Sequence, residues 1–158
     1  REMLATALRA ARGDPPEPPE AELQVDAPGA IPDDYVPEPV LRLNLHLRLA
    51  RVREPAEARR LSREVADRFG PPPPPMRRLL DAALLRALAR GLGIVRISAG
   101  PEAVALDFDP SRGPAPSLAE AAERAEGVEW LDGRLVRRGA SGSEDRIDRA
   151  LDLLEMLG

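Results

Sequence analysis

The chain has 158 residues, which is enough for one domain with a buried core, and its 43% hydrophobic and 32% charged residues are typical of a globular protein. It contains no cysteine and a single histidine, and all 23 basic residues are arginine. This composition excludes disulfides, thiolate metal sites, lysine Schiff-base chemistry and a Walker-type phosphate-binding loop. The net charge of −4 argues against a free-standing nucleic-acid binder, and no apolar run approaches the length of a membrane span.

Residues 1–21 are predicted to be a helix followed by a linker. Met3, Leu4 and Leu8 recur at helical spacing, and the segment 14–22 is rich in proline and glutamate. Such a composition favours a stiff, solvated linker. Because the helical pattern is present from the first residue, which is not methionine, we expect residues 1–21 to come from a preceding domain and residues 22–158 to form a single domain.

A short strand and a rigid extended segment are expected next. Leu23 and Val25 alternate with polar residues and predict a strand over residues 22–26. Prolines bracket residues 31–37, which contain the acidic pair Asp33-Asp34. This pair is a candidate for metal binding, but no third ligand is near in sequence, so a solvated turn is the favoured interpretation.

Residues 40–52 carry conflicting signals. Five leucines, from Leu41 to Leu49, alternate with other residues at the spacing of a strand. Leucine, arginine and alanine nevertheless favour helix, and Pro39 suits the first turn of a helix. We predict a helix over residues 39–52, with a strand as the alternative, and expect His46 to be an ordinary surface histidine.

A second amphipathic helix is predicted over residues 55–69. Leu61, Val65 and Phe69 form one apolar stripe, and Gly70 stands where a helix end favours a residue that accepts positive φ. Residues 71–75 are all proline and forbid continuation of the helix. They are expected to form a rigid connector, with a polyproline ligand for an aromatic groove as the alternative.

Three charged residues near the end of this helix are the candidate partner-binding site. Glu64, Asp67 and Arg68 lie beside the apolar stripe, at spacings that bring their side chains next to one another. The alternative to partner binding is an intrahelical ion pair between Glu64 and Arg68, which contributes about 0.3–0.5 kcal/mol.

The following residues predict a long helix and a hairpin. Apolar residues at i, i+3 and i+4 predict a helix over residues 74–91 that is stopped by Gly91 and Gly93. Residues 94–98 and 104–108 read as two strands joined by a turn, which together form a β-hairpin.

The last part of the chain predicts a helix, a second hairpin and a final helix. Ser117 and Glu120 form a capping box that opens a helix to about Ala125. A hairpin over residues 128–136 turns at Asp132-Gly133. The segment Ser141-Gly142-Ser143-Glu144 is expected to cap the final helix, whose inner side is formed by Ile147, Leu151, Leu154 and Met156.

This order of elements predicts an α+β fold. Helices are expected to pack on a small antiparallel sheet built from two hairpins and the short N-terminal strand. No set of residues suggests a catalytic centre, a cofactor-binding loop or a metal site. We therefore expect a non-catalytic domain that needs no cofactor.

An ordered set of short stretches resembles the C-terminal domain of bacterial transcription-repair coupling factors (Mfd). The resemblance covers roughly residues 1–98, and the five-proline run is longer than in the family pattern. Beyond Ala99 the similarity is one of length and element pattern. The stretches that carry the resemblance are the helix 1–11, the polar linker, Glu22-Leu23-Gln24-Val25, residues 31–37, Arg42-Leu43, Asp67-Arg68-Phe69-Gly70-Pro71, Leu79-Leu80-Asp81 and Leu92-Gly93-Ile94.

The resemblance implies a regulatory role. The parent proteins are ATP-driven DNA translocases that push stalled RNA polymerase off lesions and recruit the excision-repair protein UvrA. Their C-terminal domain has no catalysis of its own, and it docks on the UvrB-like module, where it masks the surface that UvrA uses. Glu64, Asp67 and Arg68 match the helix end of the family pattern and would be the contact residues of this autoinhibitory latch.

The resemblance also implies a location in the bacterial cytoplasm, without a membrane partner and without direct nucleic-acid binding by this domain. The competing hypothesis is a nucleic-acid-binding accessory domain. It rests on residues 42–68, which carry eight arginines against four acids.

Overall fold

The computed structural model describes residues 7–8, 11–13, 18–25, 29–139 and 145–158. Most of the predicted helix over residues 1–11 and the predicted cap at residues 141–144 lie outside the described residues. Within that first segment Ala7, Leu8 and Ala11 are helical.

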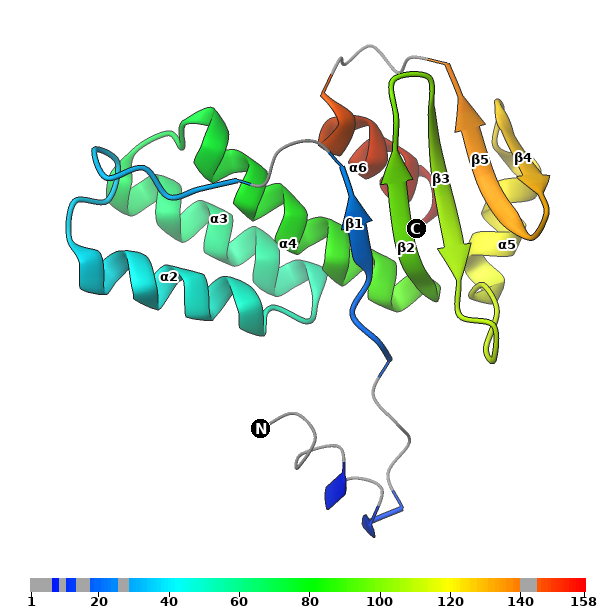
Figure 1. Cartoon of the computed structure of the whole chain (residues 1–158), viewed down its shortest axis with the longest axis horizontal. Coiled ribbons are helices and arrows are strands. Elements are labelled where there is room, and N and C mark those ends of the chain that lie inside the picture. Colours follow the sequence, from blue (N-terminus) through cyan, green and yellow to red (C-terminus); the bar gives the residue numbers. More distant parts are fainter. Residues whose placement is uncertain (1–6, 9–10, 14–17, 26–28, 140–144) are drawn as a thin grey trace.

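The described part of the chain forms three consecutive helices followed by a sheet with two covering helices (Figure 1). In Figure 1 the helices α2, α3 and α4 lie side by side at one end, and α4 runs on towards the sheet. The elements are β1 (Glu22–Gln24), α2 (Pro39–Arg51), α3 (Pro55–Phe69), α4 (Pro74–Leu92), β2 (Ile94–Ala99), β3 (Ala103–Phe108), α5 (Pro116–Arg124), β4 (Val128–Leu131), β5 (Arg134–Arg138) and α6 (Arg146–Leu157).

The five-stranded sheet has the order β1-β2-β3-β5-β4. The two predicted hairpins, β2–β3 and β4–β5, and the short N-terminal strand are confirmed. The sheet is mixed rather than antiparallel throughout, because β1 pairs in parallel with β2 through Glu22–Arg96 and Leu23–Ile97. Parallel neighbours need a long connection, and here the chain passes through α2, α3 and α4 before it returns beside β1.

Two hydrophobic clusters stabilise the fold, and α4 belongs to both. Met76 and Leu80, near the start of α4, pack with buried residues of α2 and α3. Leu85 and Leu92, near its end, pack with the sheet and with α5 and α6. The long helix therefore joins the helical end of the domain to the sheet.

The conflict over residues 40–52 is resolved in favour of the helix. Pro39 occupies the first turn of α2, and Leu45 and Leu49, four residues apart, are the buried side chains. Leu43 and Leu47 are 61% and 50% exposed, so the alternating leucines do not form one buried face as they would in a strand.

Three details of the predicted helices are wrong. The helix α5 begins at Pro116 with Ala115 as its N-cap, so the Ser117 capping box does not form. Gly91 lies inside α4, which ends at Leu92 and is capped by Gly93 with a φ of 79°. In α6 the side chain of Met156 is 40% exposed, because Leu157 turns inward in its place.

Candidate functional site

The end of α3 is held in place from its buried side. Leu61 and Val65 are 4% and 1% exposed, and they pack in the cluster formed with α2 and α4. Gly70 ends the helix with the predicted positive φ, 88°. The hydroxyl of Tyr35 donates a hydrogen bond to the Gly70 carbonyl oxygen at 2.7 Å, and its ring lies 5.8 Å from that of Phe69.

Glu64, Asp67 and Arg68 lie on the exposed side of this helix end. The structure therefore places the three predicted site residues on one exposed surface, beside the buried stripe of Leu61 and Val65. None of them fills the core, and all three side chains are exposed.

The ion pair of Glu64 is made with another helix. The guanidinium of Arg48 in α2 donates a hydrogen bond to the Glu64 carboxylate. This bond, with the charges of Arg48 and Arg68, lowers the pKa of Glu64 from its ordinary value. Arg68 instead lies over the ring of Phe69, with its guanidinium carbon 5.2 Å from the ring centre.

Arg48 is a member of this surface that sequence reasoning missed. It is separated from Glu64 by sixteen residues and lies on a different helix, so no local spacing rule links the two. Only the packing of α2 beside α3 brings them together.

A groove of about 390 Å³ lies next to the Arg48–Glu64 pair, between α2 and α3. Its lining combines charged side chains of both helices with two apolar ones. The lining residues are Arg48, Arg51, Val52, Glu57, Arg60, Leu61 and Glu64.

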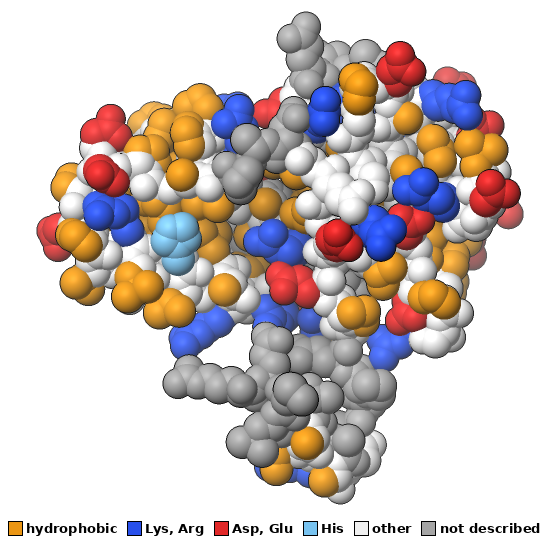
Figure 2. Space-filling model, in the orientation of Figure 1, with side chains coloured by type: hydrophobic (Ala, Val, Ile, Leu, Met, Phe, Trp, Pro, Cys, Tyr) orange, Lys and Arg blue, Asp and Glu red, His pale blue; other side chains and the backbone are white. Residues whose placement is uncertain are grey.

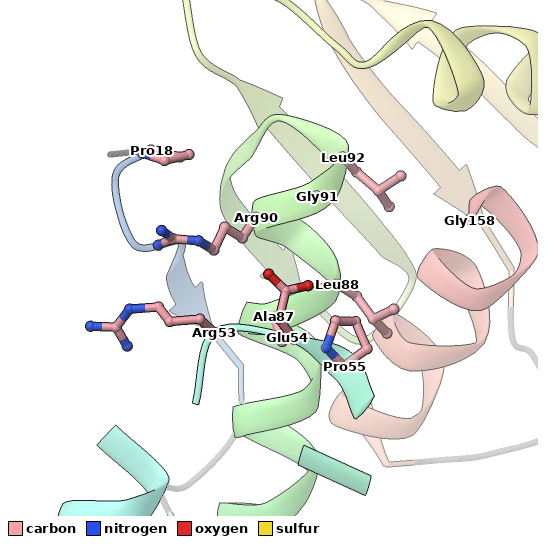
Figure 3. Close-up of a pocket in the computed structure, with 10 residues that line it drawn as sticks. All are labelled: Pro18, Arg53, Glu54, Pro55, Ala87, Leu88, Arg90, Gly91, Leu92 and Gly158. Carbon is pink, nitrogen blue, oxygen red and sulfur yellow. The ribbon is translucent and has the colours of Figure 1, made fainter. Parts of the chain in front are cut away.

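A second hollow, of about 380 Å³, lies between the start of α3 and the end of α4 (Figure 3). Most of its lining is apolar or backbone, and its charged residues are Arg53, Glu54 and Arg90. Glu54 is the N-cap of α3, where it forms a capping box with Glu57. Its lining contains no serine, threonine, histidine or cysteine.

The other candidate residues lie apart from any site. His46 is exposed on α2. The Oδ1 atom of Asp33 lies 4.0 Å from Nε of Arg42, and the side chain of Asp33 is 93% exposed. Among the described residues, no three His, Cys, Asp or Glu side chains gather in a way that could hold a metal ion.

The arginine-rich stretch is partly engaged within the domain. Arg42 donates hydrogen bonds to the carbonyl oxygens of Val36 and Pro37, and Arg53 donates one to that of Ala50. Together with Arg48, three arginines of this stretch therefore have partners inside the fold. Some guanidinium donors of this stretch are therefore already used within the domain.

A protein-family model described as TRCF domain matches residues 25–118, which include α2, α3, α4 and the three charged residues at the end of α3. The chain belongs to the TRCF domain family. Within the part of this TRCF domain that the structure describes, no helix combines the length and apolarity that crossing a bilayer requires.

Several curated proteins are similar to this TRCF domain. The transcription-repair-coupling factor of Escherichia coli is 34% identical over 89 residues, which are 56% of this chain and 8% of that protein. The one of Myxococcus xanthus is 31% identical over 164 residues, covering 99% of this chain and 14% of that protein. The chain thus spans about a tenth of the length of these relatives.

A solved structure supports the same fold. The crystal structure of the C-terminal domain of a transcription-repair coupling factor matches with a TM-score of 0.69 and 19% identity, covering 88% of this chain and 92% of that one. The α+β arrangement is therefore that of a TRCF domain.

Proposed function

We propose that this TRCF domain is a non-catalytic regulatory domain of an ATP-dependent DNA translocase that acts in transcription-coupled nucleotide excision repair. It docks on the UvrB-like module of the same polypeptide and masks the surface that UvrA uses. The longer protein works in the bacterial cytoplasm, where it binds RNA polymerase and DNA through its other domains.

The observation that carries the proposal is the exposed surface of Glu64, Asp67 and Arg68. The core and Tyr35 fix the helix end from behind, so the three side chains are presented on a rigid base. Glu64 is further oriented by Arg48. A partner surface with the opposite order of charges could pair with all three residues at once.

A contact of this kind suits a reversible latch. Exposed ion pairs contribute about 0–1 kcal/mol each, so a few of them hold a docked state without making it permanent. A tethered domain needs only modest intrinsic affinity, because the linker keeps its effective concentration near the docking site high.

The test is the triple substitution Glu64→Ala/Asp67→Ala/Arg68→Ala in the full-length protein. We expect ATPase activity and UvrA affinity to rise by about tenfold, which corresponds to roughly 1.4 kcal/mol of lost docking energy. The isolated domain should keep its helical circular dichroism, because the three side chains lie outside the core.

The chain offers a matched control on α5. Glu120, Glu123 and Arg124 have the same charge order and spacing and are also exposed. Their triple alanine variant should leave ATPase activity and UvrA binding unchanged. The proposal is wrong if the α3 variant folds but behaves like wild type, or if the α5 variant activates the protein equally.

A further inference from the structure

The outward face of α2 carries a row of exposed apolar side chains. Val40, Leu43 and Leu47 are 75%, 61% and 50% exposed, and their spacing of three and four residues places them on one side of the helix. Figure 2 shows hydrophobic side chains around the pale blue His46 on this part of the surface. We call Val40, Leu43 and Leu47 the α2 stripe.

The α2 stripe is not used by the fold. The helix is attached to the core by Leu45 and Leu49, which lie on its opposite side. Large apolar side chains that follow one another along an exposed helix face mark interaction sites more often than isolated ones do. The stripe is therefore a surface without a partner inside the described domain.

The charge on α2 indicates what kind of partner fits. The helix contains Arg42, Arg48 and Arg51 and no acidic residue. Arg51 lies one turn beyond Leu47 and lines the groove between α2 and α3, together with Arg60 of α3. No hydrogen bond or ion pair joins Arg51 or Arg60 to another described residue.

We propose that the α2 stripe and the arginine end of the groove form a second docking surface, which binds an acidic amphipathic helix. The apolar side chains of that helix would pack on the stripe, and its carboxylates would pair with Arg51 and Arg60. A second copy of this chain fits poorly, because two α2 helices face to face would bring arginines together. This surface goes beyond the proposed latch, although Glu64 of the latch also lines the groove, where it is paired with Arg48.

The dimensions fix the length of the partner. Val40 and Leu47 are separated by about two helical turns, or roughly 10 Å, and Arg51 lies about one turn further. A helix of about three to four turns, with apolar residues at i, i+4 and i+7 and glutamates on its flanks, covers this distance. Packing of one helical ridge against another is the geometry expected for such a pair.

The surface can be probed with a designed peptide. A fluorescein-labelled acidic helix of about 15 residues, with leucines at i, i+4 and i+7 and flanking glutamates, is titrated with this chain and followed by fluorescence polarisation. A second peptide carries lysine in place of every glutamate. We expect the acidic peptide to bind at least about tenfold more tightly than the basic one.

Substitutions locate the binding. Leu43→Ser/Leu47→Ser should weaken binding of the acidic peptide by about tenfold or more, because two apolar contacts are lost. Arg51→Glu should weaken the acidic peptide and strengthen the basic one. Leu131→Ser/Met156→Ser is the matched control. These side chains are 37% and 40% exposed but lie on β4 and α6, so their loss should leave peptide binding unchanged.

Four outcomes would overturn the proposal. The first is no binding of the acidic peptide at about 1 mM chain. The second is equal binding of both peptides, and the third is binding that the Leu43→Ser/Leu47→Ser variant retains. The fourth is sedimentation that shows a wild-type dimer and a monomeric Leu43→Ser/Leu47→Ser variant, which would assign the stripe to a second copy.

Discussion

Arg149 is the buried charged side chain of the described residues, with 5% of its surface exposed. Its Nη2 atom donates a hydrogen bond to the Gly100 carbonyl oxygen at 2.6 Å, and Nη1 donates one to Pro101 at 3.3 Å. These carbonyls belong to the turn between β2 and β3, so Arg149 fastens α6 to that hairpin. The Nε atom has no hydrogen-bond partner among the described residues.

Two substitutions at Arg149 should have different effects. Arg149→Ala leaves a cavity and removes both hydrogen bonds, so we expect the free energy of unfolding to fall by about 3 kcal/mol. Arg149→Met fills most of the volume without burying a charge, so its cost should be about 1 kcal/mol. Urea unfolding measures both values, and equal costs would show that volume is not what distinguishes them.

Asp81 is a half-buried acid whose pKa is changed by its surroundings. Burial, followed by the negative charge of Asp148, raises the pKa of this carboxyl group from 3.8 to about 6. Arg77 lowers the pKa in part, whereas Asp145 and Glu155 add to the rise. The group lies on α4, and the acids that face it belong to α6 or its N-cap.

The raised pKa makes the contribution of Asp81 to stability pH-dependent. The folded state holds the proton more tightly than the unfolded state, so this contribution is fully present below pH 3.8 and is lost as the pH rises through about 6. Asp81→Asn should therefore raise the free energy of unfolding at pH 8 by about 1–2 kcal/mol, a value reduced for solvent screening of a half-buried group.

The measurement is urea unfolding of both proteins at several pH values. The difference between Asp81→Asn and wild type should shrink as the pH falls from 8 towards 4. Asp152→Asn removes the charge of an exposed aspartate on α6 and serves as the control for the substitution itself. A pH-independent difference for Asp81→Asn would contradict the expected titration.

Two glycines at α4 differ in the space around them. A methyl group added to Gly91 would meet no atom within 4 Å, although the residue lies inside the helix. A methyl group added to Gly29 would lie 2.5 Å from the Pro75 carbonyl oxygen and 2.6 Å from the Leu79 nitrogen. Gly29 thus allows the segment before α2 to pass against the first turn of α4.

Alanine at these two positions should change stability in opposite directions. Gly91→Ala should raise the free energy of unfolding by about 0.5–1 kcal/mol, because alanine is the better helix former. Gly29→Ala should lower it by about 1–3 kcal/mol, because the backbone of α4 cannot move away without loss of packing. Thermal unfolding of the two variants tests both signs, and a neutral Gly29→Ala would show that the segment shifts freely.

The elements with a strong local pattern were predictable from the sequence. The apolar repeats in α3 and α4 and the two hairpins follow from side-chain spacing and turn residues, which act within a few positions. The sheet was predicted to be antiparallel, and the parallel pairing of β1 with β2 was missed, because it depends on residues far apart in the chain, such as Glu22 and Arg96. The Arg48–Glu64 pair was missed for the same reason.

Helix ends were predicted less well than helices. Ser117 has the right partner for a capping box, but Pro116 extends α5 backwards and moves the N-cap to Ala115. In α6 the predicted inner residue Met156 is exposed and its neighbour Leu157 is buried. Leu157 lies three residues after the buried Leu154 and so follows the helical spacing, which Met156 breaks.

Because α4 belongs to both hydrophobic clusters, it should make them unfold together. Trp130 is the only tryptophan and lies in the sheet, where its ring contacts that of Phe108. Its fluorescence therefore reports on the sheet, whereas circular dichroism reports mainly on the helices. Leu49→Ala removes a buried side chain from the helical cluster and should cost about 2–5 kcal/mol.

We expect both signals to give the same melting temperature in wild type and in Leu49→Ala. Truncation at the helical end should then lower the melting temperature of the sheet by the same amount, because α4 cannot unfold in one cluster and stay packed in the other. Two separate transitions in the variant would contradict this cooperativity.

The position of β1 determines how the domain would respond to tension on the segment before it. This strand has three residues, lies at the edge of the sheet and pairs only with β2. Tension on the preceding segment would act on that short ladder together with the buried Ala21 and the ion pair between Glu20 and Arg86 of α4. Under such tension β1 would separate from β2, and the two strands would pair again when the tension is released.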